Sequence, residues 1–268
     1  MTRRSLFVMV QENFGTGVTL PAFPARAEWI DSSCYKLIQL SHADQFKEIK
    51  KEVAHDRHIA ETAKVLKEAR TAFQVPRRYL ALDFETYELD HRFVTEFGIS
   101  RLDTGAEGII ETRHLITQEY EAFRNGQYVP DCKHRFRHGS SRLLPLEACK
   151  AMLVESLQWA DALIFHDTAA DMDIIQGQLG LRLPRRGVPC YDTKVLFGAK
   201  EKSKKGESLG LGRMLQKLGV VAINMHNAGN DAHGTMEAFV SMMQPDLPRI
   251  ECGTALVLQF ESDDDLEF

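Results

Sequence analysis

The sequence predicts an α/β fold whose mixed sheet begins with three strands in a meander and continues with alternating helices and strands. Three largely apolar runs, at 79–85, 93–101 and 109–116, predict the strands of the meander. Beyond residue 145, apolar residues alternate between helical and strand spacing, which is typical of parallel strands joined by helices. A length of 268 residues with 44% hydrophobic content is enough for a sizeable core beneath flanking helices.

The N-terminal part of the chain is expected to form an irregular arm followed by a long helix. Residues 1 to about 40 mix short apolar runs with glycines and prolines. From Ser41 to Phe73 apolar residues recur at helical spacing, and Ser41 with Asp44 resembles a capping box. Pro76 ends this pattern. We expect the helix to pack on the domain that follows it.

After a long insertion, the pattern predicts four more helices and two more strands. In chain order they are a helix at about 145–159, a strand at 162–166, a helix from near Ala170, a short strand ending at Asp192, a helix at about 208–218 and a helix at about 229–243. The expected organisation is an N-terminal arm and helix at 1–77, a central domain at 78–245 and a C-terminal segment at 246–268.

Composition excludes several classes of protein. No apolar stretch approaches 18 residues, so no membrane span is expected. The apolar run Leu6–Val10 is too short for the core of a signal peptide. Five scattered cysteines, odd in number and without a C-x-x-C pair, predict reduced thiols and neither a zinc site nor a disulfide framework. The sequence therefore favours an intracellular location, cytoplasmic or nuclear.

The net charge of -5 is unevenly distributed. Residues 261–268 carry five acids and no base, so the rest of the chain is formally neutral, and we expect this tail to be mobile. Basic residues gather at 133–138 with Arg142, at Arg185-Arg186 and at 200–205. Such clusters can follow a phosphate backbone, although runs of charge are often only solvated loops.

The most informative residues are acids at the ends of predicted elements. Asp83 and Glu85 close an apolar strand at spacing i, i+2, so their carboxylates share one strand face and can converge on divalent ions. Asp171 enters a helix after a buried strand, where an acid is also a favourable partner for the helix dipole. His226 precedes a helix whose first turn holds Asp231. An imidazole beside a metal-binding carboxylate is suited to take a proton from water.

Three motifs in this order resemble the DEDDh family of 3′–5′ exonucleases, which have a ribonuclease H-like fold. The family's D-x-E matches Asp83-Phe84-Glu85, its H-N-x-x-x-D matches 166–171, and its H-x-A-x-x-D matches 226–231. The resemblance covers about residues 78–243. The third motif, together with the insertion from Arg124 to Ser141, resembles a largely fungal branch that is linked to messenger RNA export and RNA silencing.

The resemblance implies a function and a set of roles. The four acids Asp83, Glu85, Asp171 and Asp231 would hold two Mg²⁺ or Mn²⁺ ions, and His226 would be the general base. The substrate implied is single-stranded nucleic acid, RNA favoured over DNA, degraded from its 3′ end to 5′-mononucleotides. No protein partner is indicated. The expected substrate contacts are Phe84, Thr86, Arg135 and Phe136.

Several alternatives stay open. The chain could be a nucleic-acid-binding or scaffold protein on the same fold, or an endonuclease of the wider ribonuclease H group. Phe136 could belong to a small core of the insertion, and Glu96 to a cross-strand ion pair. Asp167 stands where the family commonly has asparagine, and we favour a helix cap there over a contact with metal. Asp192 could orient its neighbours or cap the following helix.

Overall fold

The computed structural model describes residues 43–183, 187–204, 206–207 and 209–244. The expectations for the N-terminal arm, for Arg185-Arg186 and for the acidic tail lie outside the described residues. The chain divides into two units between Glu61 and Thr62. Helix α1 (Ala43–Phe73) begins in the first unit, and its last turns belong to the second. No described helix is both long and apolar enough to span a membrane.

Within the described residues of the second unit, the strands form one six-stranded sheet in the order β4-β3-β2-β1-β5-β6. The meander consists of β1 (Arg78–Tyr87), β2 (Asp90–Asp103) and β3 (Ile110–Thr117), which pair antiparallel. The remaining strands each lie parallel to their neighbour, and these are β4 (Arg142–Leu144), β5 (Ala162–Phe165) and β6 (Cys190–Asp192). The predicted fold class is confirmed. Strand β4 was not predicted, because three residues at the end of a polar insertion are too few to show a periodicity.

The helices follow the predicted alternation with two additions, η3 and α4. They are the short 3₁₀ turn η3 (Gln118–Tyr120), α2 (Leu146–Trp159), α3 (Thr168–Asp173), the π-helical turn η4 (Ile174–Gln178), α4 (Thr193–Glu201), α5 (Leu211–Leu218) and α6 (Ala228–Met243). Helix α4 was missing from the predicted elements. The helix expected from residue 208 begins at Leu211, because Gly210 before it has an extended backbone.

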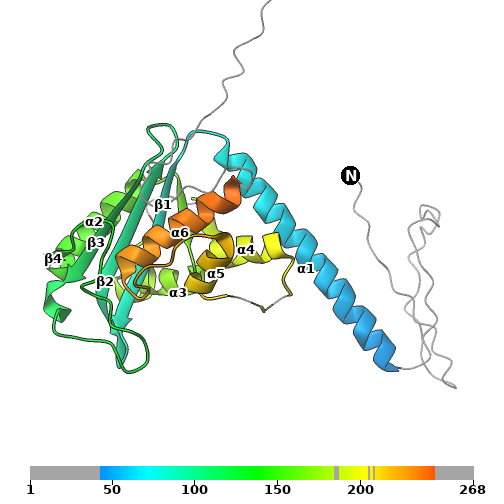
Figure 1. The fold of residues 1–268 in the computed structure, drawn as a ribbon, viewed down its shortest axis with the longest axis horizontal. Coiled ribbons are helices and arrows are strands. Elements are labelled where there is room, and N and C mark those ends of the chain that lie inside the picture. Colours follow the sequence, from blue (N-terminus) through cyan, green and yellow to red (C-terminus); the bar gives the residue numbers. More distant parts are fainter. Residues whose placement is uncertain (1–42, 184–186, 205, 208, 245–268) are drawn as a thin grey trace, which may run out of the picture. The chain divides into compact units, whose positions relative to one another are not determined.

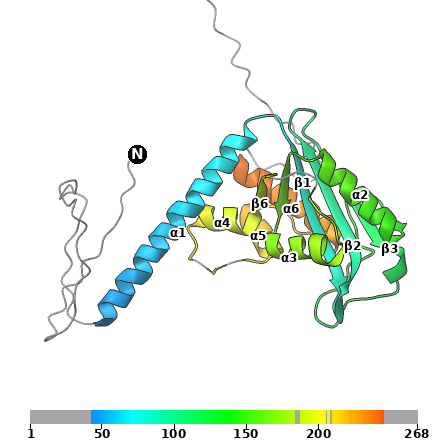
Figure 2. The ribbon, with the colours of Figure 1, turned by 180° about the vertical axis from the view of Figure 1, so that it is seen from behind.

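Side chains of β1 alternate between two cores, one on each face of the sheet. Tyr79 and Ala81 face α4, α5, α6 and the end of α1, whereas Leu80 and Leu82 face α2 and η4. Figures 1 and 2 show α6 against one face of the sheet and α2 against the other. Because strand residues two apart share a face, the side chains that follow Ala81 at positions 83 and 85 point toward the α6 layer.

The end of α1 packs into the second unit. Leu66, Ala69 and Phe73 are buried in the α6-side core. The Arg70 guanidinium donates a hydrogen bond from Nε to the main-chain oxygen of Met242 at 2.9 Å, near the end of α6. The predicted packing of this helix on the domain therefore holds for its last turns.

A single glycine lets α6 lie close against the sheet. A Cβ atom placed on Gly98 of β2 would stand 1.8 Å from the main-chain oxygen of Ala228, the first residue of α6. Gly98 pairs with Asp83 on one side and with His114 on the other, in the middle of the meander. The absence of a side chain at this position thus sets the distance between the first turn of α6 and the strand that carries Asp83.

We expect Gly98→Ala to lower the free energy of unfolding by at least about 2 kcal/mol, because backbone would have to move to admit the methyl group. Gly198→Ala is the matched control, since the nearest atom to its added Cβ would be 3.9 Å away, in Ser203. Gly198 lies inside α4, so alanine there should stabilise the protein by about 0.5–1 kcal/mol. Urea unfolding of both variants measures the difference, and equal midpoints would contradict the close approach.

Candidate metal centre

Asp83 and Glu85 project from the end of β1, beyond the neighbouring parallel strand. The pairing of β1 with β5 joins Tyr79–Ala81 to Ala162–Ile164, so the strand continues past its partner before the two acids. The register with β2 shifts directly after Glu85, which ends the regular ladder there. Both acidic side chains are half-buried. The carboxyl ends of parallel strands are where α/β folds commonly bind ligands, and here that edge carries two carboxylates.

Asp171 lies in the first turn of α3 and is 7% exposed, and its charge raises the pKa of both Asp83 and Glu85. Two other acids fix the start of this helix. The Asp167 carboxylate accepts a hydrogen bond from the Ala170 amide at 3.3 Å, and Asp192 accepts one from the Thr168 amide at 2.9 Å. The predicted cap at Asp167 is therefore confirmed. Asp192 fulfils both roles considered for it, because it orients α3 and also caps α4.

Asp167 forms an ion pair with a lysine of the next helix. Its second carboxylate oxygen lies 2.7 Å from Nζ of Lys194, and this contact lowers the pKa of Asp167. Its neighbour His166, the histidine of the second motif, is held between the Thr193 hydroxyl and the main-chain oxygen of Leu209. Burial lowers the pKa of His166 to about 4, so its imidazole is neutral and has a structural role.

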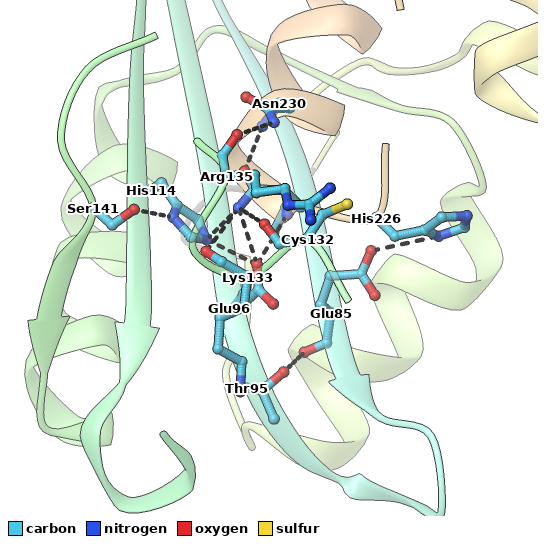
Figure 3. Close-up of polar contacts among 12 residues, drawn as sticks. Glu85, Thr95, Glu96, His114, Cys132, Lys133, Arg135, Ser141, His226 and Asn230 are labelled. Atoms are coloured by element: carbon cyan, nitrogen blue, oxygen red, sulfur yellow. Dashed lines mark hydrogen bonds and ion pairs between the residues drawn. The ribbon is translucent and has the colours of Figure 1, made fainter. Parts of the chain in front are cut away.

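His226 and Asp231 lie on either side of the start of α6. Asp231 is in the first turn and 7% exposed, whereas the His226 side chain is 44% exposed in the preceding loop. The His226 amide donates a hydrogen bond to Asp231 Oδ2 at 2.9 Å, with its backbone in the left-handed region at φ +66°. Nδ1 of His226 is 3.9 Å from Oε1 of Glu85, and Figure 3 shows the two side chains facing one another.

These residues meet in a group suited to a cation. Glu85, His226 and Asp231 each offer a ligand atom, and the three atoms lie within 4.8 Å of one another. The Asp231 Oδ1 atom is buried and has no hydrogen-bond partner. A buried carboxylate oxygen without a donor is costly unless a positive charge reaches it. Carboxylate oxygens are the ligands that Mg²⁺ and Mn²⁺ prefer, so the donor set fits the cofactor that the sequence predicts.

Burial and the charges of neighbouring acids raise the pKa of all four acids. Burial contributes most at each one. The pKa of Asp171 rises to about 8 and that of Asp231 to about 7. The pKa of Asp83 rises well above its ordinary value, through burial and then through the charges of Asp231, Asp171 and Glu85. The charges of Asp171 and Asp231 therefore act on both Asp83 and Glu85, and divalent cations would relieve this repulsion.

A buried network beneath this centre was only partly anticipated. Glu96 is 2% exposed, and its carboxylate lies 2.9 Å from Nε2 of His114. The same carboxylate accepts hydrogen bonds from the Asn227 side chain and from the Ala228 amide, at 3.4 and 3.3 Å. The cross-strand pair considered for Glu96 is thus present, and it also holds the start of α6 (Figure 3). The contact of Glu96 with Asn227 and Ala228 could not be predicted, because these residues are far from Glu96 in the sequence.

The predicted substrate contacts have different surroundings. Phe84 is buried and packs against the ring of Phe97. Thr86 is half-buried, and its hydroxyl lies 2.8 Å from Nδ1 of His91 in the β1–β2 hairpin. The ring of Phe136 is packed between His114 and the backbone of Gly229, where an added Cβ would approach it to 2.7 Å. Arg135, in contrast, has an exposed side chain.

Comparison with known proteins gives a family and several relatives. The model of a DEDDh family described as DNA polymerase III subunit epsilon-like, C-terminal domain, matches residues 78–242. An uncharacterized nucleolar protein of Schizosaccharomyces pombe is 30% identical over 219 residues, which cover 78% of this chain and 88% of the relative. The Saccharomyces cerevisiae protein named Good for full DBP5 activity protein 2 is 26% identical over 205 residues, which cover 63% of this chain and 36% of that relative. The chain therefore spans most of the first relative but only about a third of the second.

Solved structures also resemble this chain. The nuclease domain of 3′hExo, a DEDDh family member bound to rAMP, has a TM-score of 0.47 at 16% identity and covers 64% of this chain and 94% of that one. A 3′-exonuclease that recognises the 3′ end of a histone mRNA stem-loop has a TM-score of 0.46 at 15% identity. The match covers 64% of this chain and 83% of that one. At such identities the likeness concerns the fold alone.

The raised pKa values predict how the metal-free protein responds to pH. An acid whose pKa is higher in the folded state stabilises the protein only below its unfolded pKa, and this stability is lost as pH rises through the folded value. We expect the free energy of unfolding in EDTA to fall as the pH rises from about 4 and to level off once the pH exceeds the values of about 7 and about 8 at Asp231 and Asp171. Asp171→Asn should flatten this fall, and urea titrations across the range measure it.

Asp173→Asn is the matched control for that experiment, because Asp173 belongs to the same helix and is not among the four clustered acids. Its profile should run parallel to that of the wild type. Burial lowers the pKa of His138 and of His166 to about 4. The stability that these neutral histidines contribute is lost as pH falls from about 6.5, so their pH dependence is opposite in sign to that of the acids. Identical slopes for Asp171→Asn and the wild type above pH 6 would contradict the electrostatic description of the centre.

Proposed function

Because this chain belongs to the DEDDh family of DNA polymerase III subunit epsilon-like domains, we propose that it is a metal-dependent exonuclease. It removes nucleotides from the 3′ end of single-stranded nucleic acid and releases 5′-mononucleotides. The observation that supports this proposal is the group of Glu85, Asp231 and the exposed His226 at one edge of the sheet, together with the charges of Asp171 and Asp231 that act on Asp83. The preference for RNA follows from the resemblance of the third motif and the insertion to the fungal branch.

The four acids would hold two Mg²⁺ or Mn²⁺ ions. When bound, such ions lower the pKa of a water molecule and stabilise negative charge on the leaving 3′ oxygen. Before binding, the carboxylates repel one another, and two of them have pKa values of about 7 and about 8. Metal binding should therefore release protons near neutral pH and should be tighter at pH 8 than at pH 6. The unpartnered Oδ1 atom of Asp231 supports its place in the ligand set.

His226 is the proposed base. Its imidazole is exposed enough to meet a water molecule, yet its main chain is fixed by the hydrogen bond to Asp231. The neighbouring Glu85 carboxylate, 3.9 Å from Nδ1, stabilises the ring once it has accepted a proton. The imidazole takes the proton from water as the oxygen attacks the last phosphodiester.

The terminal nucleotide would lie along the end of β1. Phe84 is buried, so its contribution there would be a main-chain contact, and the Thr86 hydroxyl lies at the hairpin beside His91.

We infer a nuclear or cytoplasmic location, which the description of the fission yeast relative as nucleolar supports.

The decisive experiment follows 5′-labelled strands incubated with Mg²⁺ or Mn²⁺. Single-stranded RNA and DNA with a 3′ hydroxyl should shorten in a ladder of one-nucleotide steps, RNA faster. A 3′ phosphate should slow the reaction, because it adds charge beside the carboxylates. A duplexed end should also slow it, because bases must first unpair. Cleavage of a circular strand would instead indicate an endonuclease, and binding without cleavage would indicate a scaffold.

We expect Asp231→Asn to lower the rate by at least about 10³-fold, because a ligand charge is removed from the metal centre. The fold should survive, since an asparagine oxygen can still accept the His226 amide hydrogen. Asp83→Asn should behave in the same way. Asp173→Asn removes an acid outside the cluster and should keep the wild-type rate, so near-wild-type rates in all three variants would remove the site assignment. Rates are measured on a labelled single strand in metal-free reagents to which Mn²⁺ is added.

A histidine variant separates chemistry from metal binding. His226→Ala should lose about 10²–10⁴-fold in rate, and raising the pH should recover part of the loss. His226→Asn lacks the imidazole but tolerates the left-handed backbone, so it should lose as much. Calorimetry should show nearly unchanged Mn²⁺ affinity in both. Loss of Mn²⁺ binding would make His226 a ligand, and an active asparagine variant would make its role conformational.

A further inference from the structure

The insertion carries a short basic loop at 133–137 whose side chains divide into two kinds. Lys133 is buried, and its ammonium group donates hydrogen bonds to the main-chain oxygens of Tyr120, Glu121 and Phe123. Its side chain therefore stabilises the insertion. Arg135 and Arg137 are exposed. Within the described part of the chain neither has an acidic partner at ion-pair distance, in contrast to Arg124, which pairs with Asp131. Two guanidinium groups are therefore available to an anion from outside.

The backbone of this loop is fastened to the third motif by asparagine side chains. The main-chain oxygen of Arg135 accepts hydrogen bonds from Asn224 at 3.0 Å and from Asn230 at 3.1 Å. The Arg137 amide donates to Oδ1 of Asn230 at 3.0 Å. A third amide, that of buried Asn227, donates to the main-chain oxygens of residues 132 and 133 at 3.1 Å. Side chains of the loop are consequently presented from a rigid main chain.

The same asparagines are neighbours of the catalytic candidates. Asn230 directly precedes Asp231, and Asn227 directly follows His226. Burial raises the pKa of the Cys132 thiol, and the charges of Arg135 and Asp231 also act on it. The Arg135 and Asp231 charges therefore both lie near Cys132. In Figure 3 the Arg135 side chain extends from the loop toward the side of the view that holds Glu85 and His226. The loop thus stands at the rim of the carboxylate centre in a fixed position.

We propose that Arg135 and Arg137 form a subsite for the phosphodiester backbone of the strand upstream of the bond that is cut. This inference rests on the proposed function and adds a substrate requirement to it: a strand of several nucleotides, bound by its phosphates and not by its bases. Guanidinium groups are suited to phosphate oxygens, and a clamped loop loses little conformational entropy when it binds. The subsite also offsets the repulsion that a cluster of acids exerts on a polyanion.

Binding is tested first, in a protein that cannot cut. Anisotropy of a fluorescent single-stranded 12-mer with Asp231→Asn protein gives the reference affinity at several salt concentrations. Adding Arg135→Gln or Arg137→Gln should weaken binding about 10-fold each, and should reduce the salt slope by about 0.7 for each phosphate that the variant no longer neutralises. Lys150→Gln is the charge-matched control, because Lys150 lies on α2, on the other face of the sheet, where it pairs with Glu147. It should leave both quantities unchanged.

Activity then separates the subsite from the centre. The p-nitrophenyl ester of thymidine 5′-monophosphate has one nucleotide and no upstream phosphodiester. In otherwise wild-type protein, Arg135→Gln should raise KM for the 12-mer about 10-fold and leave kcat/KM for the ester unchanged. Equal loss on both substrates would overturn the subsite, and so would unchanged binding of the 12-mer. If the wild type cuts neither substrate, the proposed function fails, and the anisotropy data still decide whether the loop binds a strand.

Discussion

The first turn of α6 approaches the sheet across a residue that has no side chain, and most of the candidate site depends on this approach. With Gly98 of β2 beneath Ala228, the start of α6 lies beside the strand that carries Asp83 and Glu85. Ligand atoms of Asp231 and His226 then lie within 4.8 Å of one of Glu85, and the charge of Asp231 acts on Asp83. The Ala228 amide and the Asn227 side chain meet Glu96 at the same point. One close approach between helix and strand therefore determines where the charged groups of three elements meet.

Such a concentration of acids is unfavourable in the protein alone. Burial raises the pKa of each clustered carboxyl, and the neighbouring charges raise several of them further. The fold supports the arrangement with polar groups other than the four acids. Asp167 and Asp192 hold the start of α3, and the pair of Glu96 and His114 holds the start of α6. The clustered carboxylates therefore lower the stability of the metal-free protein, and bound divalent cations would offset this cost.

The sequence was most informative where chemistry and periodicity coincided. The strand bearing Asp83 and Glu85 and the helix starts bearing Asp171 and Asp231 were predicted, because each acid stands at the boundary of an apolar or helically spaced run. The cap at Asp167 was predicted for the same local reason. Strand β4 and helix α4 were not, since the first is too short to show a pattern and the second follows the strand ending at Asp192 without a break.

Contacts made across the fold could not be inferred from sequence spacing. The hydrogen bonds from Asn227 to Glu96 and to the insertion join residues that are about a hundred positions apart. Phe136 is adjacent to Arg135 in sequence, and two roles were left open for it, a contact with nucleic acid beside Arg135 or a place in a small core of the insertion. In the structure, the ring of Phe136 packs against His114 while Arg135 is exposed. Neighbouring residues in a loop point in different directions, and no periodic rule predicts which one faces solvent.

The asparagines of the third motif connect two parts of the protein that evolution could otherwise alter separately. Asn227 and Asn230 each donate hydrogen bonds to main-chain oxygens of the insertion, so each would lose partners if the insertion were shortened. Conversely, an insertion without these amides would have unpaired carbonyls beside the helix. We therefore expect the insertion and the two asparagines to be inherited as a unit, present together or absent together among relatives. Gly229, which admits the Phe136 ring, should follow the same pattern of inheritance.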